Sequence, residues 1–155
     1  MKLYLVQHGK AKPKEEDPQR PLSREGRSDV ERVARFLAEH SAAGVGLIVH
    51  SGKTRARQTA EIMAGHLHPS GGVKEAGGLD PLAEPAVWGE RLVTETSDLM
   101  LVGHLPHLDK LVSRLVCGNE ETGVVVFQMG GVVCLSRDDS GRWRVAWMIP
   151  PDVVA

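Results

Sequence analysis

Three short apolar runs have the length and composition of buried strands, and each ends abruptly in polar residues and glycine. The runs cover residues 3–6, 47–49 and 98–102. The residues that follow them are Gln7-His8-Gly9, His50-Ser51-Gly52 and Gly103-His104. Glycine at such a place lets the backbone turn sharply or approach a ligand closely, because it has no Cβ. The pattern therefore predicts that rigid strands present histidine side chains at their ends.

Helical patterns follow these runs. Ser23 can cap a helix whose inner face is formed by apolar residues at intervals of three and four. Pro106 is well placed for the first turn of a later helix. The other helices are expected near 54–65 and 86–95. Strands that alternate with helices predict an α/β fold, a three-layer α/β/α sandwich with a mostly parallel central sheet.

The last third of the chain is expected to be β-structure. Its apolar runs predict strands over 123–129, 132–136 and 143–149, joined antiparallel at the edge of the sheet. Trp143 and Trp147 are an even number of residues apart, so they are expected on the same side of the last strand. No repeat or linker interrupts the chain, and we expect one domain over residues 1–155.

The composition of the chain argues against several classes of function. The net charge of −1 gives no field that would attract nucleic acid or an anionic membrane. No apolar run approaches the ~18 residues of a membrane span, and the N-terminus lacks a signal-peptide pattern. Cys117 and Cys134 lie in apolar surroundings and are expected to be reduced core residues of a cytoplasmic protein. The histidines show no zinc-ligand spacing, so no metal is expected.

Parallel strands bring their carboxyl ends to one edge of the sheet, where open α/β folds bind ligands. This edge would collect Gln7, His8, Ser51 and His104, and Arg55 from the first turn of the following helix. An arginine fork and helix N-termini bind phosphate oxygens, and a neutral imidazole can attack phosphorus. A second, protonated histidine would stabilise the charge on those oxygens. The edge therefore predicts an anion site.

Four segments in order resemble the histidine phosphatase superfamily, and its small SixA-type phosphohistidine phosphatases in particular: LVQHGKA at 5–11, RPLSREGR at 20–27, SGKTRARQTAEI at 51–62 and LVGHLPHL at 101–108. The resemblance implies a phosphoglycerate mutase-like fold. It also implies that His8 is the phosphorylated nucleophile and that Arg55 and His104 hold the phosphoryl group. No metal or other cofactor is implied.

Gln7 departs from the family motif, which has an arginine there. The loss of one charge-assisted contact could cost on the order of a hundredfold in rate. Lys10 is a candidate to restore part of the positive charge, although a solvated loop lysine is the competing interpretation. Gly9 and Ser51 are further candidate substrate-binding residues, and Ser51 is also placed to cap the following helix.

A general acid for the leaving group is not evident. Asp80 and Glu84, in the segment LDPLAEP, are candidates, and surface acids are the alternative. Imidazole leaves readily without such an acid, which favours phosphohistidine as the substrate. The expected partner is therefore a phosphorylated protein, such as a histidine phosphotransfer protein in signal transduction, with phosphate as the product.

Two alternatives remain open at this stage. One is a small-molecule phosphomonoesterase, and the other is a catalytically weak module that binds phosphate or a phosphoprotein, since Gln7 replaces the motif arginine. His107 is expected to be exposed in the first turn of its helix, and His50 either lines the site or merely ends its strand.

Overall fold

The fold is an α/β sandwich around one six-stranded sheet, and its computed structural model describes residues 1–40 and 44–155. The helices and strands are, in chain order, β1 (Lys2–Gln7), α1 (Arg24–His40), β2 (Leu47–His50), α2 (Thr54–Leu67), β3 (Val73–Glu75), α3 (Pro85–Thr94), β4 (Leu99–Gly103), α4 (His107–Cys117), β5 (Val132–Arg137), β6 (Trp143–Ile149) and the 3-10 turn η1 (Pro151–Val153).

The sheet has the strand order β3-β2-β4-β1-β5-β6. The first four of these strands are mutually parallel, whereas β5 pairs antiparallel with β1, and β6 pairs antiparallel with β5. The expected three-layer, mostly parallel α/β fold is therefore confirmed. Because β1 and β4 are parallel neighbours in the middle of the sheet, the residues that follow them meet at its carboxyl edge.

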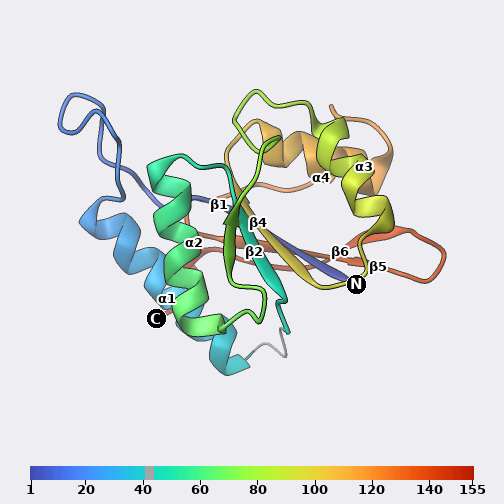
Figure 1. Cartoon of the computed structure of the whole chain (residues 1–155), viewed down its shortest axis with the longest axis horizontal. Coiled ribbons are helices and arrows are strands. Elements are labelled where there is room, and N and C mark those ends of the chain that lie inside the picture. The colour runs from blue at the N-terminus through green and yellow to red at the C-terminus, as the bar shows by residue number, and fades with distance from the viewer. Residues whose placement is uncertain (41–43) are drawn as a thin grey trace.

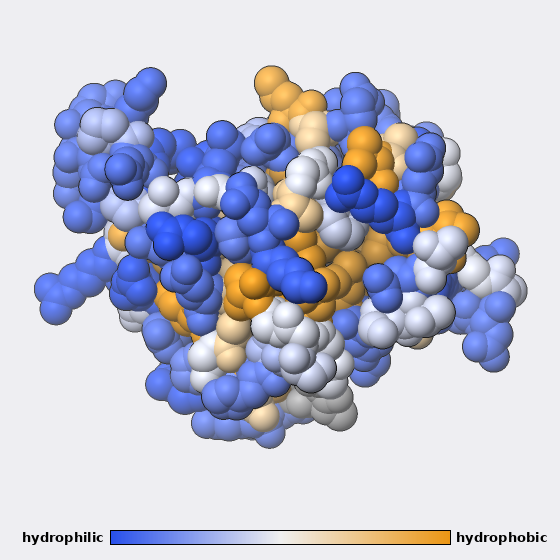
Figure 2. Space-filling model, viewed as in Figure 1, coloured by the Kyte–Doolittle hydropathy of each residue, from blue (hydrophilic) through white to orange (hydrophobic). Residues whose placement is uncertain are grey.

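Helices cover both faces of the sheet (Figure 1). Tyr4, Val6 and Met100 point to one face and pack with α1 and α2. Leu3 and Leu101 alternate to the other face and pack with α3 and α4. In Figure 2, the surface over α1 and α2 is mainly hydrophilic, and most hydrophobic positions lie toward the half that bears α3 and α4.

Helix α1 begins as its sequence predicts. The Ser23 hydroxyl accepts a hydrogen bond from the Gly26 N–H at 3.0 Å, which satisfies one of the free amides of the first turn. Gly26 also lets the helix come very close to the segment that follows β1: a Cβ there would lie 2.0 Å from the Lys10 carbonyl oxygen. The helix N-terminus and the chain beyond His8 are therefore packed backbone against backbone.

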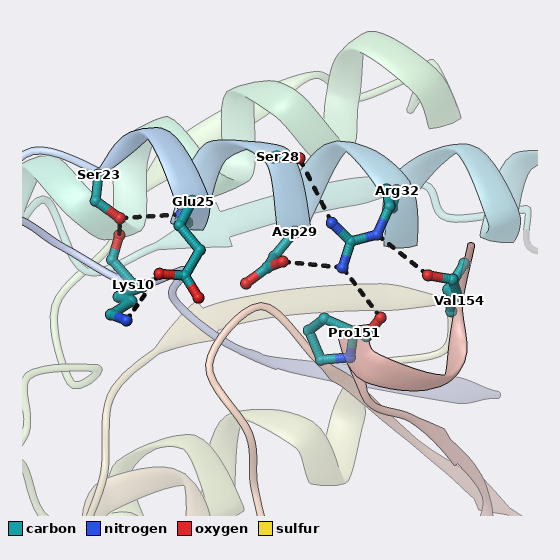
Figure 3. Close-up of polar contacts among 9 residues, drawn as sticks. Lys10, Ser23, Glu25, Ser28, Asp29, Arg32, Pro151 and Val154 are labelled. Atoms are coloured by element: carbon teal, nitrogen blue, oxygen red, sulfur yellow. Dashed lines mark hydrogen bonds and ion pairs between the residues drawn. The ribbon is translucent and has the colours of Figure 1, made fainter.

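The end of the chain is fastened to α1 by one arginine (Figure 3). The Arg32 guanidinium donates to the carbonyls of Val154 at 3.1 Å and Pro151 at 3.2 Å. It also forms an ion pair with Asp29 at 2.9 Å. Val154 is itself buried against the α1 and α2 core, so charge and packing hold η1 in place together.

The interpretation of residues 123–129 as a strand is wrong. Both edges of β5 are already paired, with β1 and β6, so no edge beside it is free for this segment. The segment instead runs along the surface, where Val125 and Phe127 pack inward and Val126 is 77% exposed. The short strand β3 adds to the edge beside β2.

The two C-terminal tryptophans lie on opposite faces of β6, contrary to the expectation. Trp143 packs in the α3 and α4 layer, and Trp147 packs in the α1 and α2 layer beside Tyr4. The pairing register shifts between Cys134 and Leu135, where the partners step from Trp147 to Val145. The extra residue of this β-bulge reverses the alternation of side chains.

Cysteine burial differs from the expectation in one case. Cys134 is buried as predicted, but Cys117 is exposed, because it is the last residue of α4 and lies beside the open turn at Gly118. Both thiols are free. Within residues 1–40 and 44–155, no helix combines the length and hydrophobicity that crossing a bilayer requires.

The close approach at Gly26 generates a stability prediction. Gly26→Ala forces a Cβ into the backbone of Lys10, and we expect it to lower the free energy of unfolding by about 1–3 kcal/mol or more. Gly65→Ala is the matched control, since it lies in α2 with open space around the new Cβ and should gain about 0.5–1 kcal/mol. Urea denaturation measures both. Equal stabilities of the two variants would contradict this account.

Candidate active site

His8 lies at the carboxyl edge, one residue beyond β1. Its backbone N–H donates to the Gly103 carbonyl at 3.1 Å, so the ladder between β1 and β4 continues through it. The side chain is only 8% exposed. His104 follows Gly103 directly and is also buried, and the two imidazole centroids are 5.0 Å apart. The structure thus brings together two histidines that are separated by nearly a hundred residues in the chain.

The hydrogen bonds of His8 define its tautomer. Its Nδ1 lies 2.7 Å from the Gly9 carbonyl oxygen, which can only accept, so Nδ1 carries the proton. The Arg55 Nε–H points at Nε2 at 3.3 Å, which agrees with a lone pair on that atom. This arrangement leaves Nε2 as the nucleophilic atom of a neutral ring.

Arg55 is held by the same segment that follows β1. The Thr59 hydroxyl donates to the Arg55 carbonyl at 2.8 Å and accepts from the Gly9 N–H at 3.0 Å. Thr59 is fully buried. One threonine therefore connects the first turns of α2 to the backbone beside His8. Gly9 takes part through its backbone: its N–H donates to Thr59, and its carbonyl oxygen lies against His8 Nδ1.

His104 is paired with Ser51. The Ser51 Oγ lies 2.7 Å from His104 Nε2 and also accepts from the Lys53 N–H at 3.3 Å. The capping role expected of Ser51 is thus limited to this one long bond just before α2. His50 is buried, and its Nδ1 accepts from the Gly52 N–H at 3.0 Å, so it shapes this loop.

Both histidines favour the neutral form. Burial lowers the pKa of His8 to about 4; the bond to Gly9 opposes this shift, and the charges of Arg55 and Arg20 add to it. Burial, followed by the charges of His8 and Arg55, lowers the pKa of His104 to about 3. A free site at neutral pH therefore holds two uncharged imidazoles beside fixed cations.

Arg20 is a cation at the site that sequence reasoning did not single out. Its charge lowers the pKa of His8, and it lowers the pKa of Arg55 after the larger effect of burial. The loop that carries it folds back on the segment after His8, where Lys12 N–H donates to the Pro21 carbonyl and Arg20 Nε donates to the Lys12 carbonyl at 3.3 Å. Arg20 opens the RPLSREGR segment, which was the available signal.

Lys10 does not direct a free charge at His8. Its ammonium forms an ion pair with Glu25 at 2.8 Å, and both side chains are about half exposed or more. Lys10 is thus exposed and paired. In Gln7, by contrast, the side-chain Oε1 is buried and has no hydrogen-bond partner among the described residues. The two residues line a cavity beside the site rather than the pair of histidines itself.

The acidic candidates lie at the surface. Glu84 is an exposed residue that precedes α3, and Asp80 is exposed in the loop before it. His107 is 1% exposed, so the expectation of an exposed side chain is wrong. Burial lowers the pKa of His107, and the charges of Asp80 and Glu120 oppose this shift.

The site can bind an anion and offer it a nucleophile. Arg55 and Arg20 supply positive charge, and His8 Nε2 supplies a lone pair between them and His104. In the described part of the chain, no group of three or more His, Cys, Asp and Glu residues is arranged to hold a metal ion.

Comparisons with solved structures agree with this fold. The protein histidine phosphatase SixA complexed with tungstate has a TM-score of 0.85 at 23% identity, over 99% of this chain and 99% of that chain. SixA from Agrobacterium tumefaciens has a TM-score of 0.77 at 23% identity, over 97% of both chains. A mycobacterial glucosyl-3-phosphoglycerate phosphatase with VO3 has a TM-score of 0.73 at 15% identity, over 94% of this chain and 97% of that chain.

A sequence comparison identifies the family to which the chain belongs. No curated protein matches the chain significantly. The model of the histidine phosphatase superfamily (branch 1) matches residues 3–80, which span the segments around His8, Arg20 and Arg55. Together with the phosphoglycerate mutase-like fold, this match shows that the chain belongs to the histidine phosphatase superfamily.

Proposed function

We propose that this phosphatase removes the phosphoryl group from phosphohistidine on a protein, through a covalent intermediate on His8. The observation that carries the proposal is the state of His8: a buried, neutral ring whose Nε2 lone pair faces Arg55 and lies beside His104. SixA, a protein histidine phosphatase that shares the fold over almost the whole chain, supports this substrate class.

The reaction has two steps. His8 Nε2 attacks phosphorus as the bond from phosphorus to the substrate imidazole breaks, and that imidazole leaves as a neutral ring because its other nitrogen already carries a proton. Water then attacks the phosphorus, the bond to His8 Nε2 breaks, and phosphate leaves with the oxygen and protons of the water, which restores the neutral His8 ring. The Gly9 carbonyl keeps the proton on Nδ1, so the ring presents the same nitrogen in every cycle.

The leaving group explains why no acid is needed at the site. Imidazole has a conjugate acid with a pKa near ~6.5 and leaves far more readily than an alkoxide. Asp80 and Glu84, the acidic candidates, are both exposed at the surface. A site with this composition suits phosphohistidine better than a sugar phosphate, whose alkoxide must be protonated as it leaves.

Arg20 replaces the charge that Gln7 lacks. Lys10 is neutralised by Glu25 at the surface, whereas the Arg20 charge reaches both His8 and Arg55. We infer that Arg20 and Arg55 hold the phosphoryl oxygens and that His104 completes the set with Ser51 as its hydrogen-bond partner. Gln7 contributes a neutral amide at the border of this group.

His8→Ala tests the activity directly. We expect phosphate release from a histidine phosphotransfer protein phosphorylated on its histidine to fall on the order of 10³-fold or more, because the nucleophile is removed. Mass spectrometry should detect a phosphorylated intermediate in the wild type only. His40→Ala, at the exposed end of α1, is the matched control and should behave as wild type. No release by the wild type, with tungstate still bound, would favour a binding module.

The pKa of His8 predicts how the site responds to pH. Protonation occupies Nε2 and removes the nucleophile, so a folded pKa of about 4 keeps His8 active throughout the neutral range. Because the unfolded ring takes up its proton near ~6.5, folding stability should fall as the pH drops from there toward 4. NMR titration of the histidine C–H signals, assigned with His8→Ala, measures the midpoint. A midpoint near that of a free histidine would contradict the assignment of a neutral, buried nucleophile.

Arg20→Ala and Lys10→Ala separate the two cations. We expect Arg20→Ala to weaken tungstate binding roughly tenfold to a hundredfold, because a charge-assisted contact to the oxyanion is lost. Lys10→Ala should change the affinity less than about twofold, since its charge is paired with Glu25 in a solvent-exposed position. Calorimetric titration measures both affinities. The reverse order would return Lys10 to the site and remove Arg20 from it.

A further inference from the structure

A groove opens beside the site on the side of Gln7. Its volume is about 510 Å³, well beyond what a phosphoryl group requires and within the range of pockets that hold much larger ligands. Two of its lining residues are direct chain neighbours of the two histidines: Gln7 precedes the nucleophile His8, and Leu105 follows His104. The groove ends at Pro151 and Asp152, in the η1 turn.

One wall of the groove is a polar stripe on α1 (Figure 3). Glu25, Asp29 and Arg32 are spaced by four and three residues, which places them on one helix face. Lys10 lies at one end of this stripe, bound to Glu25, and Pro151 lies at the other end, bound to Arg32. The hydrogen bonds that fasten the chain end to α1 therefore also build a fixed wall.

A second wall is largely apolar. It is formed by Leu105, Phe127 and Met129 together with Gln128, and Leu105 and Met129 are 38% and 43% exposed. The wall belongs to the segment that sequence analysis took for a strand and to the loop after His104. The Gly130 N–H donates to the Gln7 carbonyl at 2.9 Å, which fixes this segment against the end of β1. Exposed apolar side chains at a fixed place beside a reactive centre suit contact with a partner.

The charged residues that line the groove indicate which ligands it favours. Lys10 and Arg32 are both engaged with carboxylates, Glu25 and Asp29. Asp152 is exposed and forms no ion pair with any other described residue. Three carboxylates against two cations leave the lining with a net negative charge, so it favours a basic ligand over a second phosphate or another anion.

We propose that this groove docks the polypeptide segment that carries the phosphohistidine, with an apolar residue of the segment against Leu105 and Met129 and a basic residue facing Asp152. Gln7 lines the groove directly before the nucleophile in the chain, so an uncharged amide borders this part of the groove. An arginine at this position would carry a positive charge there and would offer only donors. The inference rests on the proposed function and adds the place and the chemistry of the protein substrate.

The test compares two substrates. One is a histidine phosphotransfer protein phosphorylated on its histidine, and the other is free phosphohistidine, which reaches the nucleophile without filling the groove. Met129→Glu and Asp152→Lys change exposed side chains on the apolar wall and at the outer end, so both variants should fold. Val93→Glu is the matched control: it places the same charge on a 74% exposed valine of α3, away from the groove.

We expect Met129→Glu to lower kcat/KM for the phosphoprotein about tenfold or more and to leave kcat/KM for free phosphohistidine within about twofold. Asp152→Lys should also lower the value for the phosphoprotein, with an effect that shrinks at high salt. Val93→Glu should match the wild type on both substrates.

Each other outcome overturns a stated claim. If the wild type dephosphorylates both substrates and Met129→Glu does so equally well, the docking groove is wrong and the proposed function stands. An equal loss on both substrates would assign the groove to the leaving group of a small molecule and would also overturn the proposal. If the wild type releases phosphate from neither substrate, the proposed function fails, and the groove proposal fails with it.

Discussion

The hydrogen bond from the His8 N–H to the Gly103 carbonyl is the contact on which the site depends. It extends the pairing of β1 and β4 by one residue beyond the last strand residue, so His8 and His104 leave the sheet at the same level. The position of each imidazole is then set by the centre of a fully packed sheet rather than by a flexible loop. Such placement lets two residues distant in sequence keep the spacing that a reaction requires.

The helices that pack against the backbone after β1 position the other groups of the site. Thr59 connects the backbone after His8 to the first turns of α2, and thereby positions Arg55. Gly26 lets α1 approach the same backbone from the other side. Burial then keeps both histidines neutral, so the positive field of the site comes from its two arginines. A histidine under these conditions keeps a ring nitrogen with a free lone pair and carries no positive charge.

Much of this arrangement could be predicted from the sequence. Apolar runs that end in polar residues and glycine placed His8, Ser51 and His104 at one edge, because the direction of parallel strands follows from the alternation with helices. Arg20 could not be placed in this way. It lies in a loop, and its approach to His8 depends on how residues 11–22 fold back on themselves, which periodicity does not encode.

The other errors have the same origin in tertiary structure. Residues 123–129 have the composition of a strand, but the sheet has no free edge beside β5 for them, and they form a wall of the groove instead. His107 has the position of an exposed first-turn residue, yet it is buried in the folded chain. In both cases tertiary packing, which the local sequence pattern does not encode, decided where the residues lie.

The bulge in β6 has a spectroscopic consequence. It divides the three tryptophans of the chain between the two cores: Trp88 and Trp143 lie in the layer of α3 and α4, and Trp147 lies in the layer of α1 and α2. The intrinsic fluorescence of the protein therefore contains a separate reporter for each side of the sheet. A protein without that one extra residue in its last strand would place Trp143 and Trp147 in a single layer, and these two tryptophans would no longer report on the two layers separately.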